Sequence, residues 1–202
     1  MAAAIGAGLG IDEPAATTVV DVGGGTSEVA VISLGGTVVS EALRLGGYDL
    51  DEAIAAWVRA NCGLAIGEVT AERVKLEVGC CMQLETPLVT QVRGRDPVTG
   101  LPREADVTSD NVREAIEAPI VDIIDATKAT LEQTPPELAS DITERGITLA
   151  GGGALLRGFA ERIELETRVP VAIADEPLTC VALGAALALE EMELLERTAT
   201  AV

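Results

Sequence analysis

Runs of apolar residues near the start of the chain predict strands. Three such runs follow one another, separated by short polar or glycine-rich segments: residues 17–22, 27–33 and 37–44. Gly35-Gly36 is typical of a two-residue hairpin turn between the second and third runs. The pattern therefore predicts an antiparallel meander, and glycines just after residues 2–7 indicate that a short helix ends before it.

Three longer segments repeat apolar residues at helical spacing. The first carries them at i, i+4, i+7 and i+8: Leu50, Ile54, Trp57 and Val58. It predicts an amphipathic helix that ends near Gly63. A second helix is expected over residues 70–82, with Thr70 as its N-cap. A third is expected over 109–133, where Pro119 should kink it or split it in two.

The rest of the chain alternates turn signals with further elements. Extended stretches are expected over residues 83–107, around an exposed loop rich in turn residues, RGRDPVTGLPR at 93–103. Beyond Pro135-Pro136, which should stop the long helix, four more elements are expected: a strand at 147–150, a helix from near Ala154, the strand VPVAIA, and a final helix over 177–197. This order predicts an α/β layer with a small second lobe.

The composition excludes several kinds of site. The chain has 202 residues and no histidine, so it has neither a Ser–His–Asp triad nor a histidine-ligated zinc, and its four cysteines form no CxxC pair. A net charge of −19, with one Trp, one Tyr and one Phe, argues against nucleic acid and against an anionic membrane surface. No basic residue precedes the apolar N-terminal stretch, and no apolar run reaches the ~20 residues of a membrane span. We therefore expect a soluble, cytoplasmic protein with reduced thiols.

Two glycine triplets, each at the end of a predicted strand, are the candidate chemistry. The first lies in DVGGGT, residues 21–26, and the second in AGGGA, residues 150–154. Each alone has a plain explanation, a hairpin turn or a tight strand-to-helix connection. Bare glycine backbone can also approach a phosphate, and an adjacent carboxylate can hold a divalent cation. Because ligands gather at the carboxyl ends of strands in α/β sheets, the two triplets together favour a nucleotide site.

These motifs resemble those of the actin and sugar-kinase superfamily. VVDVGGGTSEVAVIS resembles its second phosphate loop, TAERVKLEVG the ribose-contacting helix of prokaryotic members, and PPELASDITERGITLAGGGALLRG the adenosine motif. MAAAIGAGL resembles the first interdomain connecting helix. Together they resemble the MreB family of bacterial actin homologues, over nearly the whole chain. The resemblance implies an actin-like ATPase (ribonuclease H-like) lobe of the α/β class, with a small α+β inserted subdomain.

The resemblance implies a role for each matching residue. Asp21 would hold Mg²⁺ through water, and the loop after it would cradle the phosphates of ATP or ADP: Gly23, Gly24, Gly25 and Thr26. The ribose and adenine edge would be reached from the second predicted helix by Glu72, Arg73 and Lys75. The adenosine and α-phosphate would be backed by Gly151, Gly152, Gly153, Ala154 and Leu155. The residues alone favour a solvated salt bridge between Glu72 and Lys75, at i and i+3, whereas the motif around them favours ligand binding.

The resemblance also implies a division of the chain. The expected parts are a connecting helix (1–15), a core nucleotide-binding subdomain (16–63 and 113–176), an inserted small subdomain (64–112), and a C-terminal helix that packs on another lobe (177–202). The resemblance begins in the middle of the family's sequence, so the N-terminal lobe, with the first phosphate loop and the glutamate that orients the attacking water, is expected to be missing. ATP turnover by this chain is therefore left open. The family's GGD also reads Gly46-Gly47-Tyr48 here.

The leading functional hypothesis is an actin-like, ATP-binding cytoskeletal protein. It would polymerise head to tail and set rod cell shape by guiding cell-wall synthesis, alongside the membrane-bound elongation machinery. Arg93, Arg95 and Arg103 stand out in the acidic chain as candidates for the subunit contact. The alternative from another class is a truncated, non-catalytic module that binds nucleotide or modulates filaments. An enzyme or chaperone ATPase of the same superfamily fits the motifs less well.

Overall fold

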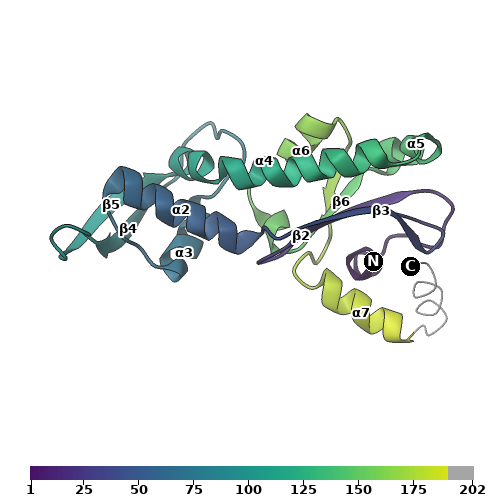
Figure 1. Ribbon diagram of the computed structural model, residues 1–202, viewed down its shortest axis with the longest axis horizontal. Helices are drawn as coiled ribbons and strands as arrows, with labels where there is room; N and C mark the ends of the chain where they lie inside the picture. Colours follow the sequence, from purple (N-terminus) through teal and green to yellow (C-terminus); the bar gives the residue numbers. More distant parts are fainter. Residues whose placement is uncertain (191–202) are drawn as a thin grey trace.

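The protein is described over residues 1–190 by a computed structural model (Figure 1). Its larger sheet has five strands in the order β3-β2-β1-β6-β7. Strands β1 (Thr17–Val22), β2 (Ser27–Ser33) and β3 (Gly36–Leu43) form an antiparallel meander, as predicted, while β6 (Ile147–Ala150) and β7 (Val171–Ile173) continue the sheet in parallel with β1. After β3 the chain forms the second sheet and its helices, and only then adds β6, which pairs in parallel with the remaining edge of β1. The larger sheet is therefore mixed.

The turn between β2 and β3 lies one residue earlier than the sequence predicts. The two turn residues are Leu34 and Gly35, because Gly36 already belongs to β3. Both have positive φ, 53° and 74°, as a type I′ turn requires at its two central positions. The amide of Leu34 donates to the carbonyl of Glu13 at 2.9 Å, which helps to hold a conformation that a leucine rarely adopts.

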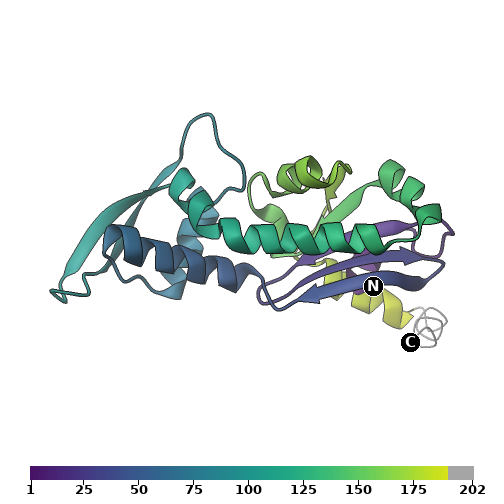
Figure 2. The same ribbon diagram turned by 45° about the horizontal axis from the view of Figure 1, so that its top comes forward.

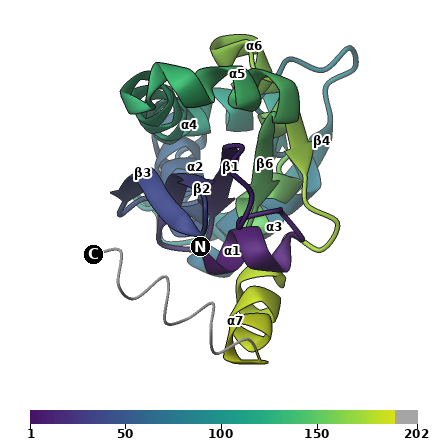
Figure 3. The same cartoon turned by 90° about the vertical axis from the view of Figure 1, so that its right-hand side faces the viewer.

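Helices cover both faces of the larger sheet (Figures 1 and 3). α4 (Ser109–Gln133), α5 (Pro136–Arg145) and α6 (Phe159–Thr167) lie on one face, and α1 (Ala2–Gly6) and α7 (Cys180–Glu190) lie on the other. Pro119 does not split α4, which is one helix through that position. Within residues 1–190, no helix combines the length and the apolarity needed to cross a membrane.

Three predicted helix starts are wrong. α3 (Glu68–Val78) begins before Thr70, because the carbonyl of Gly67 already accepts hydrogen bonds from the amides of Thr70 and Ala71. After β6, one 3-10 turn, η1 (Gly152–Leu155), replaces the helix expected from Ala154, and α6 starts later. The final helix starts at Cys180, and its predicted end at residue 197 lies outside the described residues.

The second sheet and α3 form one end of the elongated molecule (Figure 2). β4 (Val89–Arg95) and β5 (Pro102–Thr108) make an antiparallel hairpin, and α2 (Gly47–Cys62) packs against α3 and α4. One apolar cluster joins this end to the larger sheet, with members from both sheets and from α4: Val20, Val29, Val92, Val107, Ile116 and Ile120. Phe159 is the only aromatic residue among the buried core residues of the described chain, as the scarcity of aromatic residues predicts.

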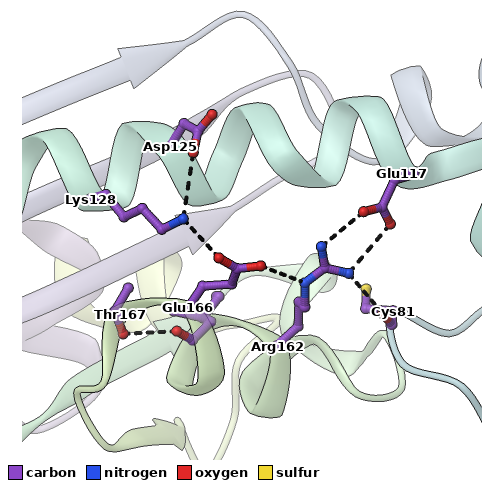
Figure 4. A network of polar contacts seen from close by, with 8 residues as sticks. Cys81, Glu117, Asp125, Lys128, Arg162, Glu166 and Thr167 are labelled. Atoms are coloured by element: carbon purple, nitrogen blue, oxygen red, sulfur yellow. Dashed lines mark hydrogen bonds and ion pairs between the residues drawn. The ribbon is translucent and has the colours of Figure 1, made fainter.

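A network of ion pairs fastens α6 to α4 (Figure 4). Arg162 on α6 bonds Glu117 on α4 at 2.8 Å, and Lys128 on α4 bonds Glu166 on α6 at 2.9 Å. Arg162 also lies 3.3 Å from Glu166, which closes the network. Its hydrogen bond to Glu117 is the main cause that raises the pKa of Arg162. These contacts hold α6, and the loop that leads into it, in a fixed position on α4.

α1 and α7 approach each other so closely that their backbones touch. A β-carbon placed on Gly184 would lie 1.9 Å from the carbonyl oxygen of Ala2, and one on Gly6 would lie 1.8 Å from the carbonyl oxygen of Cys180. Neither neighbour is the end of a flexible side chain, so only glycine fits at both positions. The pairing places Cys180, Gly184 and Ala188 on the buried face of α7.

Gly184→Ala is expected to destabilise the protein. Glycine to alanine inside a helix normally stabilises by about 1 kcal/mol, but here the added methyl group forces α1 and α7 apart, and overpacking costs about 1–3 kcal/mol. Urea unfolding measures the change. Gly36→Ala is the control, because a β-carbon there would meet nothing closer than 3.8 Å. Equal stability of Gly184→Ala and the wild type would show that the two helices do not need this contact.

Candidate functional site

Four segments enclose a cavity of about 420 Å³ between the larger sheet and α3. They are the loop after β1, the first turn of α2, one face of α3, and the segment from η1 to the start of α6, with Leu178 at the edge. The lining residues are Gly23, Gly24, Gly47, Tyr48, Leu50, Asp51, Glu72, Lys75, Leu76, Gly79, Gly152, Gly153, Leu155, Leu156, Arg157 and Leu178. Both glycine triplets therefore contribute to one site.

The loop after β1 is fixed through its carbonyl groups. The carbonyls of Gly23 and Gly24 accept hydrogen bonds from the amides of Gly47 and Tyr48, at 2.9 and 2.7 Å, in the first turn of α2. The main chains lie so close that a β-carbon on Gly46 would come within 2.7 Å of the Gly23 carbonyl oxygen. No hydrogen bond within the described chain engages the amides of Gly24 and Gly25, so both remain available to an anion.

Tyr48 leans over this loop. A β-carbon on Gly24 would lie 3.0 Å from the ring of Tyr48, and the side chain is 69% exposed. The ring therefore forms part of the cavity rim above the first glycine triplet. The sequence marks this position only as a departure from the family's GGD, without indicating where the side chain lies.

Lys75 is held by α2. Its ammonium donates to the carbonyl of Gly47 at 2.8 Å, and it lies 2.9 Å from both carboxylate oxygens of Asp51. The two side chains are only 14% and 7% exposed. Burial raises the pKa of Asp51, an effect that Lys75 opposes and that Glu72 and Glu68 strengthen. The salt bridge between Glu72 and Lys75 that the residues alone favoured is therefore wrong, because Asp51 is the partner of Lys75.

The other two residues named on α3 lie on different sides of the helix. Glu72 is exposed and lines the cavity. Arg73 does not line it, because its guanidinium bonds Glu77 at 2.7 Å and the carbonyl of Gln91 at 3.0 Å, toward β4. Leu76, one turn after Glu72, adds an apolar and 65% exposed side chain to the same wall.

The second glycine triplet crosses β1 at its end. A β-carbon on Gly151 would lie 2.4 Å from the carbonyl oxygen of Val22, and one on Gly153 would lie 2.4 Å from a methyl group of Val22. Of the residues named here, Gly152, Gly153 and Leu155 line the cavity, Gly151 does not line it, and Ala154 is buried. Gly25 and Thr26 also lie outside the lining.

Asp21 lies at the junction of the two triplets. A β-carbon on Gly151 would come within 2.5 Å of its carboxylate, and Glu28 sits opposite it on β2. Asp21 does not line the cavity itself. Its half-buried position raises its pKa, and the nearby charge of Glu28 raises it further. The site thus holds a carboxylate whose ionisation is disfavoured, which a bound cation would relieve.

Sequence reasoning missed three polar lining residues. Tyr48 is in the first turn of α2, Asp51 follows that turn, and Arg157 follows η1. Asp51 could be linked to Lys75 only by knowing that α2 packs on α3. Arg157 lies within the quoted motif GGGALLRG, but nothing in its spacing indicates the contact that it makes.

A sequence model of the family described as MreB/Mbl protein matches residues 1–197. The cell shape-determining protein MreB of Escherichia coli (strain K12) is 50% identical over 194 residues, which are 96% of this chain and 56% of that protein. The chain therefore spans little more than half the length of such relatives. The family resemblance drawn from the motifs is confirmed.

Solved structures share the fold. The crystal structure of MreB5 of Spiroplasma citri bound to ADP matches with a TM-score of 0.91 and 38% identity, over 95% of this chain and 58% of that one. The same figures hold for that protein bound to AMPPNP. The MamK double helical filament matches with a TM-score of 0.77 and 26% identity, over 94% of this chain and 57% of that one. The predicted α/β actin-like fold is confirmed.

Lys75→Met is expected to lower the free energy of unfolding by about 3 kcal/mol, because it leaves the carboxylate of Asp51 buried without its partner. The folded-state pKa of Asp51, already raised, would rise further. The folded protein then holds a proton that the unfolded chain releases, so stability falls as pH rises above the ordinary Asp range. The loss should therefore be larger at pH 8 than at pH 5, measured by urea unfolding.

Two further variants test this assignment. Asp51→Asn combined with Lys75→Met should recover most of the stability, because the double variant leaves no buried charge. Lys128→Met removes the chain's only other lysine, from a more exposed ion pair, and should cost at most about 1 kcal/mol. A double variant as unstable as Lys75→Met would contradict the pairing.

Proposed function

The chain belongs to the MreB/Mbl family, and on that premise we propose that it is the nucleotide-binding part of an actin-like filament protein that sets rod cell shape by guiding cell-wall synthesis. The observation that carries the proposal is the single cavity in which both glycine triplets meet α3. Relatives with the same fold are bound to ADP and to AMPPNP, and a more distant one forms a filament.

The cavity suits each part of an adenine nucleotide. Leu76, Leu155 and Leu178 are exposed on its walls and offer apolar surface to a planar base. Glu72 can accept hydrogen bonds from ribose hydroxyls. The free amides of Gly24 and Gly25, next to the first turn of α2, suit phosphate oxygens because a helix N-terminus carries partial positive charge.

Asp21 fits a role in holding Mg²⁺. Carboxylate oxygens and water are the ligands that Mg²⁺ prefers. Burial and Glu28 both disfavour the ionised form of Asp21 when no cation is present. Bound Mg²⁺ would reduce the repulsion between the phosphates and the acidic protein. Asp21 would hold the ion through water, since its side chain lies behind the cavity lining.

Self-association through the β4–β5 hairpin is part of the proposal. The hairpin forms a tip of the molecule (Figure 2) and exposes Val98 and Leu101 by 91% and 65%. The basic character expected there is reduced, because Arg93 pairs with Glu104 and Arg103 pairs with Asp96. Arg95 forms no ion pair among the described residues and is the arginine best suited to a neighbouring acidic subunit. Such head-to-tail contacts build open filaments, which would work beside the membrane-bound elongation machinery.

The chain is expected to bind Mg-ADP, measured by calorimetry. Asp21→Asn should weaken binding in Mg²⁺ by about tenfold, as the loss of one charge-assisted contact implies, and should not weaken binding in EDTA, where the carboxylate only repels the phosphates. Without metal and nucleotide, the same variant should melt at a higher temperature than the wild type, because it removes a carboxylate that burial penalises. Asp106→Asn, at an exposed position on β5, is the matched control. No binding by the folded wild type at millimolar ADP would contradict the proposed function.

Arg95→Ser should reduce co-sedimentation of this chain with filaments of a full-length MreB relative. An electrostatic contact should also weaken as salt rises from 50 to 300 mM, since the screening length shortens to well below 10 Å. Arg44→Ser, at an exposed position just after β3 of the larger sheet, serves as the control because it makes the same change of charge outside the hairpin. If Arg95→Ser sediments like the wild type at every salt concentration, the subunit contact lies elsewhere.

A further inference from the structure

Arg157 connects two opposite walls of the cavity. It follows η1 in the chain, and its guanidinium donates to the carbonyls of Leu76 and Gly79, at 3.2 and 3.3 Å, at the C-terminal end of α3. These two carbonyls lie where a helix has unpaired acceptors and partial negative charge, which suits a cation. One side chain thus joins the wall that carries Leu155 to the wall that carries Glu72 and Lys75.

Main-chain contacts also join the segment around Arg157 to the segment that follows α3. The amide of Cys81 donates to the carbonyl of Arg157 at 2.7 Å, and Cys80 pairs with Arg157 as a short parallel bridge. Gly158 lies against Met82, since a β-carbon placed on Gly158 would be only 3.0 Å from the side chain of Met82. The backbone bond anchors the segment after α3, whereas the guanidinium reaches back into the last turn of the helix.

We propose that Arg157 is a positioning residue that sets the distance between α3 and the 152–157 segment, and so the width of the space for the nucleoside. This inference rests on the proposed nucleotide-binding function. Arg157 acts through Leu76 and Gly79, which it holds, so its effect falls on the base and ribose. In the proposed function the phosphates would lie at the first glycine triplet, which hydrogen bonds from Gly47 and Tyr48 fix independently of Arg157.

The expected consequence is a loss of preorganisation. Without the guanidinium, the C-terminal half of α3 samples positions that change the space between Glu72 and Leu76 on α3 and Leu155, which line the cavity together. The apparent dissociation constant rises in inverse proportion to the population of the competent arrangement. The loss is therefore the same for every ligand that contains adenosine, whatever its number of phosphates.

The test is a calorimetric titration of the full chain with adenosine, with ADP in EDTA and with Mg-ADP. Arg157→Ala should weaken all three by the same factor, about tenfold, comparable to losing one hydrogen bond from a charged donor. Arg157→Lys keeps a cation but not the planar fork, so it should weaken all three by about threefold. Arg59→Ala removes an exposed arginine from α2 and should match the wild type.

Each outcome decides between explanations. A greater loss for ADP than for adenosine would show that Arg157 contacts phosphate directly and would overturn the inference. So would affinities equal to those of the wild type in both variants. If Arg157→Ala does not fold, the threefold loss in folded Arg157→Lys decides the matter, with unchanged affinity overturning the inference. A wild-type chain that binds none of the three ligands would overturn the proposed function, and this inference with it.

Discussion

The cavity depends on main chain lying directly against main chain where its loops meet. At Gly46 the start of α2 touches the carbonyls of the first glycine loop, and at Gly151 the second loop touches the end of β1. A β-carbon at either position would come within 2.4–2.7 Å of a carbonyl oxygen. Any other residue would move α2 or η1 away from β1. The free amides and the position of Asp21 follow from these two crossings.

Charge sets the second constraint. The protein carries a net charge of −19, yet its candidate ligand is an anion. Lys75 adds little net positive charge to the cavity, because both oxygens of Asp51 lie 2.9 Å from its ammonium. In the proposed function, phosphate binding would therefore depend on backbone amides, the N-terminus of α2 and a cation near Asp21. This is why removing one carboxylate can weaken anion binding and stabilise the empty protein.

The sequence predicted features that are encoded in short segments and missed those that depend on packing. The glycine triplets, the meander and most helices follow from local patterns, and the family motif located Glu72 and Lys75. The sequence could have shown that Arg73 lies on a different face of the helix from Glu72 and Lys75, because residues at i, i+3 and i+4 share a face whereas the residue at i+1 does not. Asp51 could not be paired with Lys75, since the two meet only when α2 packs on α3. The sequence could not fix the start of α3 either, because Gly67 and Thr70 are both acceptable N-cap residues.

The continuous core limits how this part of the protein can respond to a nucleotide. Val20 and Val29 of the larger sheet belong to the same apolar cluster as Val92 and Val107 of the hairpin. Rotation of one sheet against the other would break aliphatic packing, at about 25 cal/mol for each Å² of apolar surface exposed. The walls of the cavity belong to the same cluster through Val74 and Val78 of α3 and Ala154 of η1. Hydrogen bonds from Lys75 and Arg157 add to this packing. A bound nucleotide would therefore shift α3 only together with α2 and β4, which pack against it, so any movement at the cavity would reach the hairpin.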